Sequence, residues 1–307
     1  MGTPEFAVHI LDRILAAGYP VVGVVTAPDK PAGRGRKIQL SPVKAFAQRE
    51  GLRILQPVNL KSEPFLEALR ELQADLQIVV AFRMLPREVW EIPRLGTFNL
   101  HASLLPQYRG AAPINWALIN GENKTGVTTF FIDERIDTGE ILLQKEVEIS
   151  ETDDAGDLHD RLMKVGAEIV LQTIQEIVEQ KVTRRPQAVT ADQKKAHKLS
   201  RENTRISWDL PLRSIRDHIR GLSPHPVAWT YFQNGNQEIT LKLFRAEILP
   251  EDHRFEPGKV ILDHQDLKIA TQEGFVVPKE VQLPGKRRMK VEDLLNGYRI
   301  FPNAKVF

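Results

Sequence analysis

The sequence has no cysteine among its 307 residues. This absence excludes disulfides, thiolate nucleophiles and zinc–thiolate sites, and it fits a reducing compartment. No run of about 18 apolar residues is present, so we expect no membrane-spanning helix. The N-terminus lacks the basic region and apolar core of a secretory signal. A Gly-x-Ser-x-Gly nucleophile turn and a Gly-Lys-Ser/Thr phosphate loop are also missing. We therefore expect a cytoplasmic protein that uses neither a cysteine nor an elbow serine as a nucleophile.

The length allows two domains with separate cores, and the charge is unevenly divided between the two ends of the chain. Residues 191–307 hold 20 Lys and Arg against 15 Asp and Glu, which gives +5, whereas residues 1–190 carry −3. A basic C-terminal part suits a polyanionic partner. An ordinary solvated surface would produce the same mild asymmetry.

Apolar strands alternate with amphipathic helices along the first part of the sequence. We expect helices over 5–17, 41–50 and 63–73, and buried strands over 21–26, 52–55 and 75–82. This alternation predicts an α/β fold with a doubly wound parallel sheet. In such a sheet, ligands bind beyond the carboxyl ends of the strands.

Closely spaced short strands follow from Ile206 onward, and they predict a small β-barrel. A polar and charged stretch precedes them and is typical of a linker. We therefore expect a first domain over residues 1–182, a linker over 183–202 and an OB-like barrel domain over 203–307.

The stretch 97–113 begins as a strand and ends as a loop, and it carries the candidate catalytic groups. Asn99 and His101 point to the same face because side chains alternate along a strand. A side-chain amide can donate to a developing oxyanion, and a neutral imidazole can take a proton near pH 7. Asp137 follows the apolar run 127–132, so a neighbouring strand end could bring its carboxylate to the imidazole.

Two other interpretations of these groups are open. An isolated Asn-x-His pair is more often structural than catalytic. A metal site is the other use for His101 and Asp137, but no third His or Cys falls at a ligand spacing, so we expect no metal.

Three motifs together resemble the folate-dependent formyltransferases, and the resemblance covers nearly the whole chain. The motifs are Asn-Leu-His-Ala-Ser-Leu-Leu-Pro at 99–106, Arg-Gly-Ala-Ala-Pro at 109–113 and Asp-Thr-Gly at 137–139. The resemblance implies direct transfer of a formyl group from 10-formyltetrahydrofolate to an amine, without an acyl-enzyme. The match is closest to members that formylate methionine on initiator tRNA. An amino sugar nucleotide or glycinamide ribonucleotide is the alternative acceptor, and an inactive nucleic-acid-binding protein is the non-enzymatic alternative.

The resemblance also implies roles for individual residues. Asn99 would donate to the formyl oxyanion, and His101 would stabilise that oxyanion or move the proton. Asp137 would orient His101 and help to protonate the leaving nitrogen through water. The folate would contact the loop and turn residues Ser103, Leu104, Leu105, Pro106, Phe82, Met84 and Leu85. Core packing is the alternative for Met84 and Leu85.

Two basic stretches are candidates for holding the tRNA. The first is the loop at 29–37, where Arg34 can fork onto a phosphate or a base edge while Lys acts only as a point charge. The second is the run 285–290. The candidate tRNA-binding residues are Arg34, Arg36, Lys37, Lys286, Arg287 and Arg288. A solvated charged loop is the alternative interpretation of residues 29–37. Separately, we expect the protein to be a monomer.

The N-terminus departs from the family pattern. In the family a parallel strand of several apolar residues precedes the turn at 2–6, whereas this sequence opens at Met1. Removing a central strand would leave backbone groups unpaired, at a cost of roughly 1–3 kcal/mol for each buried group. We therefore expect the start of the gene to lie upstream of Met1.

Overall fold

The structure is a computed structural model that describes residues 1–32, 37–188, 192–264 and 266–307. Contacts divide the chain into two units, each built from three segments. The first unit holds Met1–Gly110, Thr125–Val147 and Asp160–Lys195, and the second holds Ala111–Lys124, Glu148–His159 and Ala196–Phe307. The linker expected at 183–202 stays a prediction. Two earlier segments, Ala111–Lys124 and Glu148–His159, pack with the C-terminal segment in the second unit.

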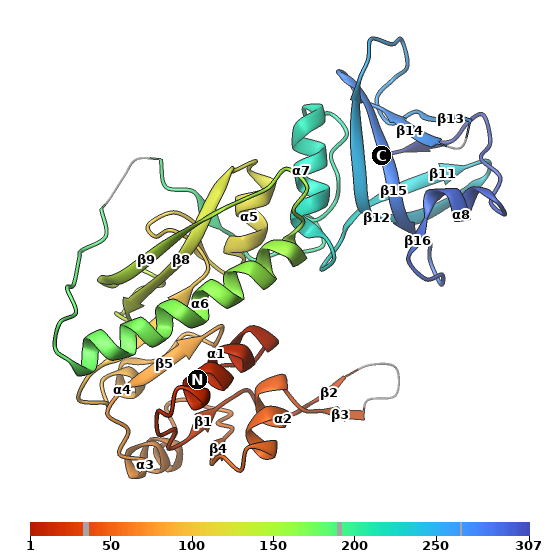
Figure 1. The fold of residues 1–307 in the computed structure, drawn as a ribbon. Helices are drawn as coiled ribbons and strands as arrows, with labels where there is room; N and C mark the ends of the chain where they lie inside the picture. The colour runs from red at the N-terminus through yellow and green to blue at the C-terminus, as the bar shows by residue number, and fades with distance from the viewer. Residues whose placement is uncertain (33–36, 189–191, 265) are drawn as a thin grey trace. The chain divides into compact units, whose positions relative to one another are not determined.

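Strands and helices alternate along the first unit, as its hydrophobic pattern predicts (Figure 1). The first elements are α1 Glu5–Ala16, β1 Val24–Val25, β2 Lys30–Ala32, β3 Lys37–Gln39, α2 Pro42–Arg49, β4 Ile54–Leu55 and α3 Glu63–Glu71. The next are β5 Gln77–Val80, α4 Arg87–Trp90, β6 Thr97–His101, β7 Arg109–Gly110, β8 Lys124–Phe131, β9 Ile141–Glu148 and α6 Ala155–Val178. The hydroxyl of Ser41 caps α2 by accepting from the Lys44 N–H at 3.1 Å. The three expected helices are confirmed, whereas the strands are shorter than expected.

The sheet brings the carboxyl end of β6 beside two other strands. β5 pairs with β6 in parallel, and β1 pairs with β4 in parallel. β8 runs antiparallel to β6 and places Phe130 opposite Asn99 and Thr128 opposite His101. α6 lies along this sheet (Figure 1), where the hydroxyls of Thr129 and Thr173 are 2.8 Å apart. The expected α/β fold class is confirmed, with β8 as an antiparallel addition.

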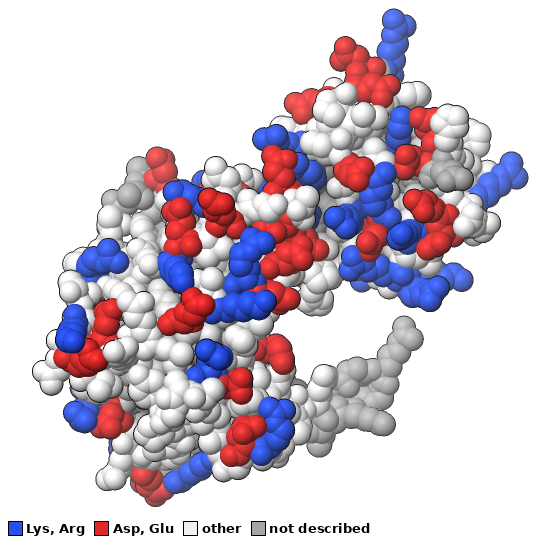
Figure 2. Space-filling view, viewed as in Figure 1, with Lys and Arg blue, Asp and Glu red and all other residues white. Residues whose placement is uncertain are grey.

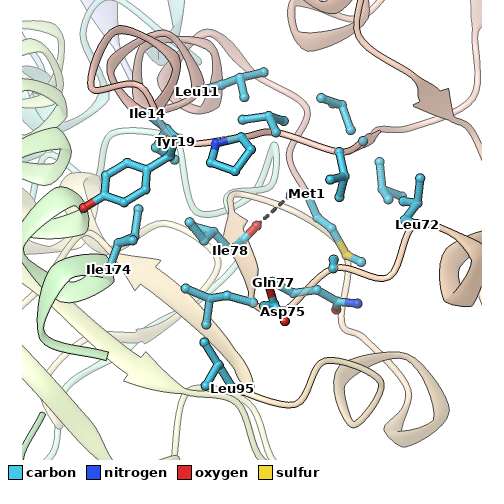
Figure 3. Close-up of a pocket in the computed structure, with 18 of the residues that line it drawn as sticks. Met1, Leu11, Ile14, Tyr19, Leu72, Asp75, Gln77, Ile78, Leu95 and Ile174 are labelled. Atoms are coloured by element: carbon cyan, nitrogen blue, oxygen red, sulfur yellow. Dashed lines mark hydrogen bonds between the residues drawn. The ribbon is translucent and has the colours of Figure 1, made fainter. Parts of the chain in front are cut away.

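Met1 and Gly2 lie between β1 and β5. The Gly2 N–H donates to Val25 O at 3.0 Å, and the Val80 N–H donates to Met1 O at 2.9 Å. The Met1 amino group donates to Ile78 O at 2.6 Å, and burial lowers its pKa to about 5. A cavity of about 440 Å³ adjoins it, with apolar walls that include Leu11, Ile14, Leu72 and Ile174 (Figure 3). The upstream start stays a prediction.

Antiparallel strands form the barrel of the second unit, in the order β13-β14-β15-β12-β11-β17, with β16 paired to β15. The elements are α5 Pro113–Ile119, β10 Lys195–Ala196, α7 Leu212–Leu222, β11 Ala228–Asn234, β12 Gln237–Pro250, β13 Val260–Asp263, β14 Asp266–Ala270, β15 Gly274–Gln282, β16 Met289–Lys290, α8 Val291–Leu295 and β17 Lys305–Val306. A bridge between Lys259 and Lys305 nearly closes the barrel. Ile215 and Leu222 of α7 are fully buried in its core with Phe232 and Leu243. The expected barrel is confirmed.

None of the helices within the described ranges is long and apolar enough to cross a membrane. Across the same ranges, no group of three His, Cys, Asp or Glu side chains could hold a metal ion.

Candidate functional site

Asn99 and His101 lie at the carboxyl end of β6, on one face of the strand, as the alternation predicts. The ring of His101 is buried with 6% exposed, and Asn99 is half-buried. Among the described residues, no side-chain or backbone group is hydrogen-bonded to the Asn99 amide. Its two N–H groups are therefore available to a ligand at the strand end, which is where an open α/β sheet binds one.

The backbone of Tyr108 fixes the tautomer of His101. Nε2 of the imidazole lies 2.8 Å from the Tyr108 carbonyl oxygen. A carbonyl oxygen can only accept, so Nε2 carries the hydrogen in the neutral ring and Nδ1 has a free lone pair. This Nδ1 lies 3.8 Å from Oδ2 of Asp137. Nδ1 is therefore the ring nitrogen of His101 that is free to accept a hydrogen, and it faces the carboxylate of Asp137.

A tight turn holds the Asp137 carboxylate toward His101. Asp137 has a left-handed backbone with a φ of 55°, and its Oδ2 accepts from the Gly110 N–H at 2.9 Å. The turn also requires glycine at position 139. A Cβ atom there would lie 1.7 Å from the Phe131 carbonyl oxygen, so no larger residue fits. The structure thus brings together His101 and Asp137, which are far apart in the sequence, while their catalytic roles stay predictions.

Sequence reasoning missed two residues of this site, Arg109 and Gln187. Nε and Nη2 of Arg109 donate to Oε1 of Gln187 at 3.0 and 2.7 Å. Nε2 of Gln187 donates to the carbonyl oxygens of Asp137 and Gly139 at 2.9 and 2.8 Å. Burial lowers the pKa of Arg109, and the charge of Asp137 opposes this effect. Arg109 stands in a motif that the sequence singled out, whereas Gln187 lies in a stretch without any local signal.

The residues expected to contact folate lie in different surroundings. Ser103 is fully buried and donates to Gln107 O at 2.6 Å. Leu105 is also buried, and its N–H donates to the Thr128 hydroxyl at 3.1 Å. Leu104 and Pro106 are half-buried. These contacts fix the loop that follows β6, and a role in folate binding stays a prediction.

The other three residues expected to contact folate lie in the turn after β5 and differ in their exposure. Leu85 is buried in a hydrophobic cluster, against which Phe82 packs. Met84 is 62% exposed. Core packing thus applies to Leu85, while Met84 is available at the surface and its contact with folate stays a prediction.

The expected tRNA-binding residues are described only in part. Arg34 and Arg36 lie outside the described residues, and Lys37 begins β3 but its side chain is not described. Lys286 and Arg287 are exposed between β15 and β16. Arg288 pairs with Glu280 and lies over the ring of Phe244, 4.5 Å from its centroid. Figure 2 shows many Lys and Arg side chains on the visible face of the second unit, interspersed with Asp and Glu.

Known proteins resemble the chain in both units. A family model described as formyl transferase matches residues 1–174, and one described as formyl transferase, C-terminal domain, matches residues 198–299. A methionyl-tRNA formyltransferase of Flavobacterium johnsoniae is 54% identical over 100% of this chain and 98% of its own length. One of Bacteroides fragilis is 52% identical over 98% of this chain and 94% of its own length.

Solved structures share the fold at lower identity. The sugar 3N-formyl transferase WlaRD, determined in the presence of dTDP and 5-N-formyl-THF, has a TM-score of 0.63. It is 22% identical and is matched over 93% of this chain and 97% of its own. An N-formyltransferase of Helicobacter canadensis, solved with folinic acid and dTDP-3-aminofucose, also has a TM-score of 0.63 at 20% identity, over 90% of this chain and 96% of its own. These structures support the fold.

Proposed function

Because the chain belongs to the formyl transferase family, we propose that it transfers a formyl group from 10-formyltetrahydrofolate to the methionine amino group of initiator methionyl-tRNA. The observation that carries the proposal is the cluster at the end of β6. There, an amide with free donors, an imidazole with a free Nδ1 and a carboxylate lie at one strand end. Both substrates belong to translation and one-carbon chemistry, so the proposed location is the cytoplasm.

The proposed reaction breaks the bond between the formyl carbon and the folate nitrogen and forms one to the methionine nitrogen. The folate supplies a formyl group that is already bonded to a nitrogen leaving group. One proton must leave the attacking amine, and one must reach the leaving nitrogen. Direct attack suits this chain because it has neither a cysteine nor a serine on a nucleophile turn.

Each side chain of the cluster has a part that fits its contacts. The free N–H groups of Asn99 donate to the formyl oxygen as negative charge develops on it. Nδ1 of His101 takes the proton of the amine, since Nε2 is engaged with the Tyr108 carbonyl. Asp137, with Oδ2 at 3.8 Å from Nδ1, stabilises the imidazolium and helps to return a proton to the leaving nitrogen through water.

The barrel surface supports a polyanionic acceptor. The guanidinium carbon of Arg201 lies 4.7 Å from the Trp229 ring centroid, and that of Arg205 lies 5.0 Å from the Tyr231 ring centroid. Both arginines are exposed, and stacking on an aromatic face leaves their N–H groups able to meet phosphates.

The proposal is tested by measuring turnover with three acceptors at equal folate donor. We expect rapid formylation of charged initiator tRNA, and little with free methionine or an amino sugar nucleotide. Faster formylation of a small amine than of the tRNA would overturn the choice of acceptor. No turnover with any amine would overturn the enzymatic function itself.

Removing a group of the cluster should slow turnover and leave the fold intact. We expect Asn99→Ala, His101→Ala and Asp137→Ala each to lower kcat on the order of 100–1000-fold, the typical loss for an oxyanion donor. His264→Ala is a matched control because its side chain is 97% exposed. A near-normal rate for His101→Ala, with folate still bound, would contradict the assignment.

Substitution of the basic residues that are proposed to hold the tRNA should affect tRNA use more than the chemical step. We expect Arg34→Ala to weaken kcat/KM for tRNA strongly without changing folate affinity, because a forked contact is lost. Lys286→Ala should weaken binding modestly and lower the salt slope by about one unit, as for the loss of one phosphate contact. The measurement is kcat/KM for tRNA against salt, beside a folate titration. Equal losses of tRNA use and folate affinity in Arg34→Ala would contradict the prediction.

A further inference from the structure

Gln187 uses its whole side-chain amide inside the candidate site. Its Oε1 accepts from Nε and Nη2 of Arg109, and its Nε2 donates to the carbonyl oxygens of Asp137 and Gly139. A glutamine amide offers two donors and two acceptor positions, so all of them are engaged. The orientation of the amide follows from its partners, since a guanidinium only donates and carbonyl oxygens only accept.

The backbone beside Gln187 is also paired with the turn of the site. The Ile141 N–H donates to Arg185 O at 2.8 Å, and the Arg185 N–H donates to Ile141 O at 2.9 Å. This antiparallel bridge carries Gln187 alongside the turn at 137–139. The position of its amide is therefore fixed by main-chain contacts as well as by its own hydrogen bonds.

The first effect of this amide falls on Asp137. Nε2 of Gln187 donates to the carbonyl oxygens of Asp137 and Gly139, and it therefore holds both ends of the turn at 137–139. The first residue of this turn, Asp137, has a left-handed backbone. The carboxylate of Asp137 faces the Gly110 N–H and the His101 ring, which belong to other segments of the chain. A shift of the turn would therefore move the carboxylate away from both groups.

The second effect falls on Arg109. The guanidinium is held by a neutral acceptor, so its positive charge is not cancelled by its closest partner. A glutamate in this position would form an ion pair with it. The neutral amide therefore leaves the charge of Arg109 to act on the neighbouring carboxylates of Asp137 and Asp133.

From these contacts we propose that Gln187 is a positioning residue for the reaction, which fixes the Asp137 turn against His101 and holds Arg109 without neutralising it. The inference rests on the proposed function. Gln187 touches neither substrate in this role and acts through Asp137 and Arg109. The stretch of sequence that reads as a linker would thus complete the candidate active site.

The test replaces the Gln187 amide by a carboxylate of the same shape. In Gln187→Glu, an oxygen replaces the N–H donor that faces the Asp137 and Gly139 carbonyl oxygens. The same substitution pairs Arg109 with a negative charge. We expect kcat for tRNA formylation to fall on the order of 10–100-fold, the range typical of losing a hydrogen bond that orients a metal ligand. We expect KM for folate and the melting temperature to stay near those of the wild type.

The matched control is Gln193→Glu. Gln193 lies in the same segment, and its Nε2 donates to Ala188 O at 3.2 Å, away from the turn. A second readout that needs no activity is the amide hydrogen exchange of Gly110, whose N–H donates to Asp137. Its exchange should speed up in Gln187→Glu and stay at the wild-type rate in Gln193→Glu.

Two results would overturn the role of Gln187. The first is unchanged kcat and unchanged Gly110 exchange in Gln187→Glu. The second is a lowered melting temperature with a kcat that is normal per folded molecule, which would mean general structural support. A wild-type protein that formylates no tRNA would instead refute the proposed function, and the exchange measurement would still decide whether Gln187 fixes the turn.

Discussion

The hydrogen bond between Nε2 of His101 and the carbonyl oxygen of Tyr108 determines what the site can do. At 2.8 Å it orients the ring and puts the hydrogen of the neutral imidazole on Nε2. Nδ1 is then a base that faces Asp137. With the opposite tautomer, Nδ1 would donate to the carboxylate, and no ring nitrogen would be free to accept a proton. Tyr108 is itself held in place, because its N–H donates to Lys194 O at 2.7 Å.

The polar groups of the site are supported mainly by hydrogen bonds between chain segments that are distant in sequence. The segments 109–110, 137–139 and 185–187 meet around the Gln187 amide and the Asp137 carboxylate. Three buried apolar residues from the same part of the chain, Leu105, Phe130 and Ile141, form a small cluster of their own. This arrangement suits a site that must hold charges in a fixed geometry, since hydrogen bonds fix direction whereas apolar contacts mainly fix distance.

Much of this architecture follows from local sequence patterns. The helices could be predicted because their apolar spacing and caps are local, as Ser41 before α2 illustrates. Asn99 and His101 could be placed because alternation along a strand and the position of its end are local too. Asp137 was expected near His101 because strand ends can meet at one edge of a sheet. The two side chains do meet, but β8 runs antiparallel to β6, so the turn that follows β8, and not the end of the strand, brings the carboxylate to the imidazole.

Other features depend on contacts that no local pattern encodes. Gln187 serves the site from an irregular segment, and its partners come from two other parts of the chain. The antiparallel direction of β8 was likewise not predictable from its apolar run. Leu85 and Met84 are both apolar and adjacent, yet one is in the core and the other is exposed. Such differences are settled by tertiary packing.

The role of the His101–Tyr108 hydrogen bond is tested most directly by the tautomer of His101, read from ¹⁵N NMR of protein labelled at histidine. The chain has eight histidines, so the His101 signals are assigned as those missing from a His101→Ala spectrum. At a pH where the ring is neutral, we expect a hydrogen on Nε2 and a lone pair on Nδ1, because Nε2 donates to the Tyr108 carbonyl oxygen. A neutral ring with its hydrogen on Nδ1 would contradict it, because Nδ1 would then donate to Asp137 and could not accept the proton of the attacking amine.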